Sequence, residues 1–273
     1  MQTNRWLGLL LLLSAVSAAN KAILICCSWQ YENYRHFANV LALQSLLERN
    51  GYSPKDIAIF MKEDILANRR NPSEQLWVGD ESLEPTKDYT PKRRDQSYYD
   101  ILNLIAGEDE VLLGADAQTN LLIYITGHGG DGFIKYCNRS YFYREDITKA
   151  LIRLQSVRRL GKVLFIADTC QADSLVDASQ LPDNVTLIST SLLGESSHSA
   201  NFNHRLNIFP IDLFVMQLTK AIKSPAIQAL TFKDLTKHEL SFGSLLSTVS
   251  IHGPDAYLQD FLWQTHRPSS LFL

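Results

Sequence analysis

The sequence has few cysteines, no excess of positive charge and no long apolar run, and each shortage excludes a class of protein. Its four cysteines, at positions 26, 27, 137 and 170, are too few and too irregularly spaced for a disulfide scaffold or a zinc site. Lys and Arg together number 26 against 29 Asp and Glu, a net charge of −3, which provides no basic surface for nucleic acid. We therefore expect no nucleic-acid partner.

The longest apolar run near the N-terminus, Leu7–Leu13, is too short to cross a bilayer as a helix, which needs roughly 20 apolar residues. Arg5 precedes this run and small residues follow it, which is the pattern of a secretory signal peptide. We predict a signal peptide over residues 1–19, cleaved near Ala19 or Asn20. An uncleaved anchor or an N-terminal core helix is the alternative.

No later stretch predicts a membrane span. The most apolar one, Ile208–Leu218, is interrupted by Pro210, Asp212 and Gln217. Residues 261–273 include Gln, His, Arg and Pro, so they predict neither a stop-transfer segment nor a GPI-attachment signal. We expect any association with a membrane to come from partners.

The remainder of the chain, residues 20–273, is expected to form one catalytic domain. Its length suits a single large core, and the chain's 45% apolar and 20% charged residues are typical of a globular protein. Two sequons, at Asn138 (Asn-Arg-Ser) and Asn184 (Asn-Val-Thr), agree with a lumenal location.

Short apolar runs alternate with segments of helical periodicity. The runs read as buried parallel strands: Ala22–Cys27, Asp56–Met61, Leu121–Thr126, Lys162–Ala167 and Val185–Ser189. Three helices are predicted from apolar residues that share one face: Phe37, Val40, Leu41 and Leu47; Ile147, Ala150, Leu151 and Leu154; and Ile211, Phe214, Val215 and Leu218. The pattern predicts an α/β fold, a three-layer sandwich with a mostly parallel sheet and helices on both faces.

Boundary signals refine this prediction. Glu145 and Asp146 favour a helix start, where the helix dipole stabilises acids. Gly51 and Gly161 are expected to end the first two helices. Residues 71–95 are rich in proline and charge without a clear period, so we expect a long excursion from the sheet.

Two strand ends carry side chains suited to catalysis. His128 follows the predicted strand Leu121–Thr126, and Cys170 follows Lys162–Ala167. Open parallel sheets bind ligands beyond the carboxyl ends of their strands, so both side chains are expected at one edge. A thiol with a pKa of about 8.5 is only a few per cent ionised at neutral pH, and a nearby imidazole can accept its proton.

Each of these residues also has a purely structural interpretation. A single histidine after a strand is often structural, and a single buried cysteine is usually inert. The adjacent Cys26 and Cys27 lie in an apolar run, where small buried hydrophobic side chains are the favoured interpretation. The combination of His128 and Cys170 at neighbouring strand ends favours a catalytic pair.

Three segments resemble signature segments of the GPI-transamidase catalytic-subunit family, which shares its fold with legumains and caspases. They are Thr126–Gly130 (Thr-Gly-His-Gly-Gly), Asp168–Ala172 (Asp-Thr-Cys-Gln-Ala) and Asn33–Val40, which begins Asn-Tyr-Arg-His. The resemblance extends to residues 68–71 and 194–197, and implies that Asp255–Trp263 is a closing strand. It therefore implies a caspase-like and legumain-like fold over nearly the whole chain.

The resemblance implies roles for the matched residues. Cys170 would attack the substrate carbonyl, and His128 would take the thiol proton and pass it to the leaving amine. Asn33 would orient the imidazole, although on position alone it is equally suited to cap the following helix. The backbone N–H groups of Cys170 and Gly129 would hold the oxyanion. Ordinary polar loop positions are the alternative to the implied substrate contacts, which are Arg35, Asp168 and Ser191.

The same resemblance implies the substrates and the setting. The expected substrates are a proprotein with a C-terminal GPI-attachment signal and the GPI lipid, and the expected partners are the other subunits of a GPI transamidase complex, in the lumen of the endoplasmic reticulum. No cofactor is expected, and no metal, since Pro54 stands where a calcium-binding acid is found in the family. Ala67 replaces a cysteine that commonly bridges to a partner subunit, so that covalent link is not expected.

Two other functions are compatible with these residues. A legumain-like asparaginyl endopeptidase would use Cys170 and His128 to release peptide to water. It more usually carries Asp-His-Gly and Glu-Ala-Cys at these positions, whereas this chain has Gly-His-Gly-Gly and Asp-Thr-Cys-Gln. A catalytically silent assembly subunit is the third possibility, and the intact set of Cys170, His128 and Asn33 argues against it.

Overall fold

The computed structural model of the chain describes residues 19–72, 75–78, 81–83, 96–200 and 202–264. The predicted signal peptide therefore lies almost entirely outside the described residues, as does most of the later part of the predicted excursion. None of the helices in the described part is long and apolar enough to cross a membrane.

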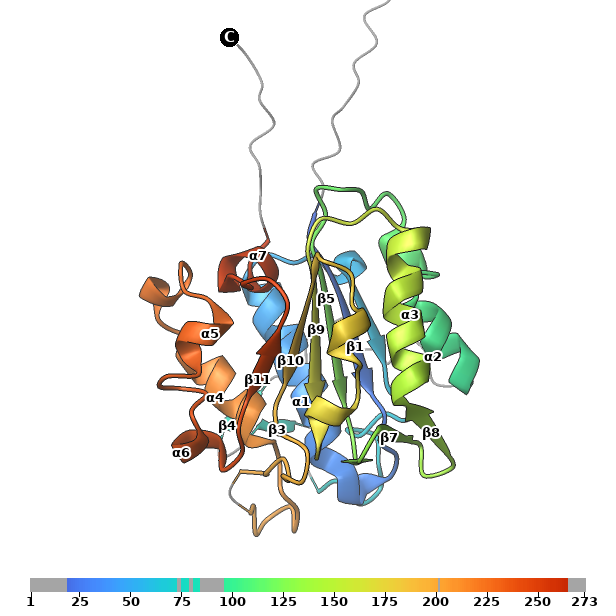
Figure 1. Cartoon of the computed structure of the whole chain (residues 1–273). Coiled ribbons are helices and arrows are strands. Elements are labelled where there is room, and N and C mark those ends of the chain that lie inside the picture. The colour runs from blue at the N-terminus through green and yellow to red at the C-terminus, as the bar shows by residue number, and fades with distance from the viewer. Residues whose placement is uncertain (1–18, 73–74, 79–80, 84–95, 201, 265–273) are drawn as a thin grey trace, which may run out of the picture.

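A six-stranded sheet forms the centre of the fold, in the order β11-β10-β9-β5-β1-β2 (Figure 1). Its strands are β1 (Lys21–Cys26), β2 (Ile57–Phe60), β5 (Leu121–Thr126), β9 (Val163–Asp168), β10 (Val185–Ser189) and β11 (Ser250–His252). All neighbouring pairs are parallel except β10 with β11. The five predicted strands are confirmed, each to within one residue at either end, because nearly every side chain in them is buried.

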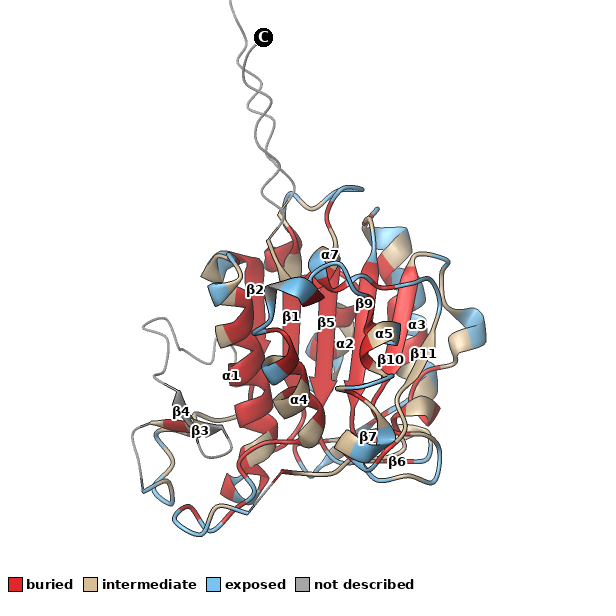
Figure 2. Ribbon diagram, turned by 90° about the vertical axis from the view of Figure 1, so that its left-hand side faces the viewer, coloured by how far each residue is buried: buried red, intermediate tan, exposed pale blue. Residues whose placement is uncertain are grey.

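Helices cover both faces of this sheet, which confirms the predicted three-layer sandwich (Figures 1 and 2). The helices α1 (Tyr34–Arg49) and α4 (Leu213–Ala221) pack on one face, against a cluster that includes Leu24 of β1. On the other face, α2 (Tyr98–Ile105) and α3 (Arg144–Val157) pack against a cluster that includes Ile23 and Ile25. Successive residues of β1 thus point into opposite core layers.

The remaining elements are short. Two small hairpin sheets consist of β3 (Leu76–Val78) with β4 (Glu81–Leu83), and of β6 (Gly129–Gly130), β7 (Phe133–Tyr136) and β8 (Ser140–Tyr143). Three short helices, α5 (Phe232–Leu235), α6 (Phe242–Leu245) and α7 (Leu258–Leu262), lie near the end of the described chain. The 3-10 helices are Tyr31–Asn33, Pro54–Asp56, Glu110–Leu112, Ala172–Ser174, Ala178–Gln180 and Pro225–Ile227.

The implied closing strand over Asp255–Trp263 is wrong. The strand that closes the sheet is β11, and the helix α7 occupies the predicted range. The reason is visible in the spacing of Leu258, Phe261 and Leu262, which are all buried and recur at helical intervals.

Gly51 follows the end of α1, at a φ of 95°, as predicted for a helix stop. Two other helix boundaries and one loop differ from prediction. Gly161 does not end α3, which stops at Val157. An added Cβ at Gly161 would lie 3.0 Å from the carbonyl oxygen of Ala117, so close packing explains this glycine. Ile211 precedes α4, and the predicted excursion over residues 71–95 contains β3 and β4.

Strand register positions the residues of interest. Thr126 at the end of β5 pairs with Asp168 at the end of β9, and with Cys26 at the end of β1. His128 and Cys170 each lie two residues beyond the pair formed by Thr126 and Asp168. The parallel register therefore brings both to the same carboxyl edge of the sheet.

Candidate active site

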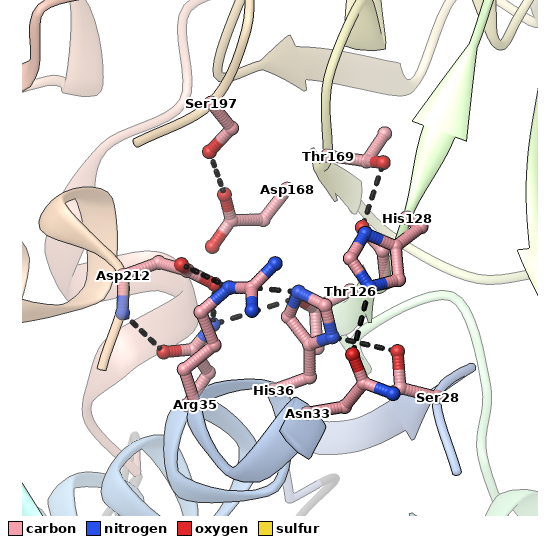
Figure 3. Close-up of polar contacts among 12 residues, drawn as sticks. Ser28, Asn33, Arg35, His36, Thr126, His128, Asp168, Thr169, Ser197 and Asp212 are labelled. Atoms are coloured by element: carbon pink, nitrogen blue, oxygen red, sulfur yellow. Dashed lines mark hydrogen bonds and ion pairs between the residues drawn. The ribbon is translucent and has the colours of Figure 1, made fainter. Parts of the chain in front are cut away.

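The imidazole of His128 is held by Asn33, which lies just before α1 (Figure 3). Nε2 of His128 lies 2.7 Å from Oδ1 of Asn33. The amide of Asn33 donates in turn to the carbonyl oxygen of Trp29 at 2.6 Å, which fixes Oδ1 as the acceptor. Nε2 of His128 is then the protonated ring nitrogen, and Nδ1 is left free to accept a proton.

Asn33 stands at the N-cap of α1, yet its side chain makes no hydrogen bond to the helix. The two interpretations that position alone could not separate are separated by this geometry. The side chain of Asn33 is committed to His128 and to the loop at Trp29, so it orients the imidazole and does not cap the helix.

The surroundings keep the imidazole of His128 neutral. Although the residue stays accessible to solvent, the protein around the ring displaces enough water to lower its pKa below 6.5. The positive charges of Arg35 and Lys135 act in the same direction. The ring of His36 meets that of His128 edge to face, with centroids 5.1 Å apart. A neutral imidazole at physiological pH is the form that accepts a proton.

Cys170 and His128 lie on loops that are tied together. The hydroxyl of Thr169 donates to the carbonyl oxygen of Gly127 at 2.8 Å. Gly129 is so close to the cysteine loop that an added Cβ would lie 2.3 Å from Oγ1 of Thr169 and 2.7 Å from the carbonyl oxygen of Cys170. Only glycine permits this approach, which brings the backbone of residue 129 beside Cys170.

The half-buried thiol of Cys170 faces Ser197, with Sγ 4.0 Å from the carbonyl oxygen. Within the described residues, no hydrogen bond joins this thiol to the imidazole of His128. The next residue, Gln171, adopts a left-handed conformation at a φ of 54° and donates its N–H to the carbonyl oxygen of Glu195. The loop that carries Cys170 therefore turns sharply at the end of β9 and contacts the segment around residues 191–197.

A cluster of buried charges lies beside the imidazole (Figure 3). Oδ1 of Asp212 lies 3.0 Å from Nε of Arg35, and Oδ2 accepts a hydrogen bond from the amide of Asn39 at 2.6 Å. Burial raises the pKa of Asp212 to about 7, the charge of Asp168 adds to this rise, and Arg35 opposes it. The position of this carboxylate thus depends on both the guanidinium and the amide.

Asp168 is the second carboxylate of this cluster. Its Oδ2 accepts from the hydroxyl of Tyr124 at 2.7 Å, and its Oδ1 accepts from Thr190 at 3.0 Å and from Ser197 at 3.3 Å. Burial raises the pKa of Asp168, and these three hydrogen bonds oppose the rise. The positive charge of Arg35 also opposes the rise.

Not every residue predicted to contact substrate lies in this cluster. Arg35 and Asp168 do. Ser191 is completely buried, donates to the carbonyl oxygen of Thr169 at 2.8 Å and accepts from the N–H of Ala172 at 3.1 Å. These two residues lie on either side of Cys170, so the hydroxyl of Ser191 holds the Cys170 loop in its turn.

Sequence reasoning missed several members of the site. The structure adds His36, Asn39, Ser197 and Asp212, whose Oδ2 lies 3.8 Å from Nε2 of His36. Two signals were available. His36 and Asn39 belong to the segment 33–40 that carried the resemblance, and an acidic residue within the apolar stretch 208–218 is a candidate for a buried partner.

The arrangement provides a thiol, a neutral imidazole with one free nitrogen, and backbone N–H groups where Gly129 closely approaches the Cys170 loop. These are the components of nucleophilic acyl transfer. Among the described residues, no three His, Cys, Asp or Glu side chains are grouped closely enough to hold a metal ion.

Comparison with known proteins places this site in a family. The family model described as the peptidase C13 family matches residues 20–239. The GPI-anchor transamidase of Schizosaccharomyces pombe is 32% identical over 244 residues, which are 84% of this chain and 64% of that protein. The human GPI-anchor transamidase is 28% identical over 222 residues, 77% of this chain and 56% of its own length. The chain thus spans less than two thirds of both relatives.

Among solved structures, caspase-1 from Spodoptera frugiperda superposes with a TM-score of 0.54 at 12% sequence identity, covering 91% of each chain. At this identity the likeness concerns the fold alone, and it agrees with the three-layer arrangement. It confirms the caspase-like fold that the sequence resemblance implied.

Proposed function

The chain belongs to the peptidase C13 family, and from that membership we propose that it is a cysteine transamidase that attaches GPI anchors. It cleaves the C-terminal GPI-attachment signal of a proprotein and transfers the carbonyl to the ethanolamine amine of GPI. The names of the two relatives support the substrate class. One observation carries the chemistry, namely the imidazole of His128, fixed by Asn33 at the same sheet edge as Cys170.

In the first half of the proposed reaction, Sγ of Cys170 attacks the carbonyl carbon while Nδ1 of His128 takes the thiol proton. The backbone N–H groups of Cys170 and Gly129 hold the oxyanion. When the carbonyl re-forms, the C–N bond breaks and His128 gives its proton to the leaving amine. The products are a thioester on Cys170 and the released C-terminal attachment signal of the proprotein.

The second half reverses these roles. The ethanolamine amine attacks the thioester carbonyl and passes a proton to His128. The C–S bond then breaks, an amide forms, and the imidazole returns the proton to the thiolate of Cys170. No atom of the protein is consumed, and the step requires the incoming amine to outcompete water at the thioester.

We assign Arg35 and Asp168 to the pocket for the residue before the cut, together with Asp212 and Ser197. This assignment is supported by their cluster at the sheet edge next to His128. The guanidinium of Arg35 supplies donors, and the buried carboxylates of Asp212 and Asp168 hold Arg35 and Ser197 in place. A polar pocket of this kind suits a small or polar side chain and disfavours a large apolar one. Ser191 acts through the nucleophile loop that it holds.

The setting belongs to the same proposal. We place the protein in the lumen of the endoplasmic reticulum, associated with the membrane through the other subunits of the complex. The exposed position of Asn138 in the turn between β7 and β8 supports a lumenal location, because its sequon is accessible to a glycan.

The test is complementation in cells depleted of the native chain, with Cys170→Ala and His128→Ala expressed separately and a GPI-anchored reporter measured at the surface. Both variants should fail while uncleaved reporter accumulates. The control is Cys26→Ala, which removes a buried thiol on β1 that takes no part in the proposed reaction. This variant should rescue. Full rescue by either site variant would rule out the proposed chemistry, and release of the reporter as free acid would indicate hydrolysis, as in an endopeptidase.

A further inference from the structure

Two cysteines that the proposed reaction does not use are brought together by the fold. Cys27 directly follows β1, and Cys137 lies in the turn between β7 and β8. The backbone N–H of Cys137 donates to the carbonyl oxygen of Cys27 at 2.7 Å. Both residues are buried, with 0% and 6% of their surfaces exposed, and both are free thiols in this structure.

Their side chains enter the same layer of the core. Cys27 and Cys137 belong to the hydrophobic cluster on the α2 and α3 face of the sheet. Cys26 belongs to the cluster on the opposite face, with α1 and α4. The alternation of side chains along a strand therefore separates the adjacent cysteines, and only Cys27 of the two shares a layer with Cys137.

The backbones are close enough for a covalent bond. With an N···O distance of 2.7 Å between Cys137 and Cys27, standard bond lengths place the two Cα atoms no more than about 6 Å apart. Disulfides span Cα···Cα distances of about 4.4–6.8 Å. The Cα separation of Cys27 and Cys137 is thus within disulfide range, and both side chains lie in one core layer.

We propose that Cys27 and Cys137 form a disulfide in the oxidising lumen, and that this bond fixes the two segments that hold the catalytic imidazole. The proposal rests on the lumenal location in the proposed function. Each thiol loses one proton and the pair loses two electrons to a protein or glutathione disulfide, which is reduced to two thiols.

The position of the bond explains what it would fix. Cys27 begins the segment that leads to Trp29 and Asn33. Cys137 directly follows β7, the second strand of the hairpin that begins just after His128. The Cβ of Cys27 lies 3.0 Å from where a Cβ on Gly127 would be. The disulfide would thus join the segment that carries Asn33 to the segment that carries His128, and would restrain the hydrogen bond between these two residues.

A second contact already joins the same two segments. The guanidinium of Arg139, two residues after Cys137, lies over the ring of Trp29 at 5.3 Å from its centroid. The carbonyl oxygen of Trp29 is the acceptor that holds the amide of Asn33. The packing that orients the imidazole is thus continuous with the cysteine pair.

Peptide mapping tests the proposal. The full chain is expressed through the secretory pathway, alkylated under denaturing conditions without reduction, digested and analysed by mass spectrometry. We expect the peptide with Cys27 joined to the peptide with Cys137, two hydrogens lighter than the sum. Because Cys26 shares a peptide with Cys27, the assignment needs variants: the link should persist in Cys26→Ala and disappear in Cys27→Ala.

Thermal unfolding provides the second measurement. The bond closes a loop of about 110 residues, so reduction of wild type should lower the thermal midpoint by roughly 10 °C. Cys137→Ser should already have the lower midpoint and not respond to reductant. The Cys170→Ala variant should keep both the link and the response, which separates this test from the fate of the transamidase proposal. Fully alkylated Cys27 and Cys137, or a link that survives in Cys27→Ala, would overturn the inference.

Discussion

At the scale of single residues, the contact with Asn33 determines which ring nitrogen of His128 carries the proton. Asn33 accepts from Nε2, and its own amide is committed to the carbonyl oxygen of Trp29. A flipped amide would lose the bond to the backbone, so the network selects one orientation. Orientation of a base by a third residue is the usual support for a nucleophile that is weak at its free pKa.

Removing this support should slow the reaction without abolishing it. Asn33→Ala deletes one hydrogen bond of about 1.4 kcal/mol, which corresponds to about tenfold in rate. We expect that loss in native-state alkylation of Cys170 and in processing of the reporter. Glu32→Ala is the matched control, because Glu32 is exposed and pairs with Arg70 on the surface. A rate for Asn33→Ala equal to that of Glu32→Ala would contradict the orienting role.

The buried carboxylate of Asp212 makes stability depend on pH in a direction that the structure sets. Its pKa is about 7 in the folded chain against an ordinary 3.8, so the folded protein binds this proton more tightly. The stabilisation is therefore complete below about pH 4 and is lost as the pH rises through 7. Asp212→Asn is neutral throughout and should gain thermal midpoint relative to wild type between pH 5 and pH 8.

A carboxylate without this shift supplies the comparison. The pKa of the partly exposed Asp234 is lowered by hydrogen bonds from Lys237 and Thr231, so Asp234 stays ionised over the same pH range in both states. The difference between wild type and Asp234→Asn should then be constant from pH 5 to pH 8. Parallel pH curves for wild type and Asp212→Asn would be evidence against a raised pKa at Asp212.

At the scale of elements, the hairpin of β6 and β7 packs closely against the loop after β9. The contact is made by Gly129, where the space for a side chain is already filled by Thr169 and by the carbonyl oxygen of Cys170. One of these neighbours is backbone and cannot rotate away. The short strand β6 is thus a spacer that sets the distance between the histidine loop and the nucleophile loop.

Gly129→Ala should force these two loops apart. Loss of one oxyanion donor costs about a hundredfold to a thousandfold in turnover, and we expect a loss of that order in reporter processing. Gly243→Ala in α6 is the control, since nothing lies within 4 Å of an added Cβ there. Turnover of Gly129→Ala within a few fold of the Gly243→Ala variant would contradict the close approach.

At the scale of the whole molecule, the sequence predicts the parts of the fold that depend on local pattern. The strands are found because they are apolar throughout, and Cys170 and His128 are found because each lies two residues beyond the end of one. Asp212 could not be assigned in this way, because its partner Asn39 lies 173 residues away and only the packing of α4 beside α1 joins them. The same holds for Cys27 and Cys137, whose spacing in the sequence indicates no pairing.

The proposed passage through the secretory pathway leads to a prediction on the two sequons. Asn138 is exposed in a turn, whereas the amide of Asn184 donates to the carbonyl oxygens of Leu160 at 3.3 Å and Gly161 at 2.8 Å. A glycan on Asn184 would replace one of those N–H donors beneath the start of β9 and leave a carbonyl without its partner, which costs about 1–3 kcal/mol. Protein expressed through the secretory pathway should therefore carry a glycan at Asn138 and none at Asn184.

Glycosidase treatment and mass measurement test this directly. Asn138→Gln should remove the glycan, and Asn184→Gln should keep it while lowering the thermal midpoint. A glycan mapped to Asn184 would mean that its hydrogen bonds to residues 160 and 161 do not form in the mature protein.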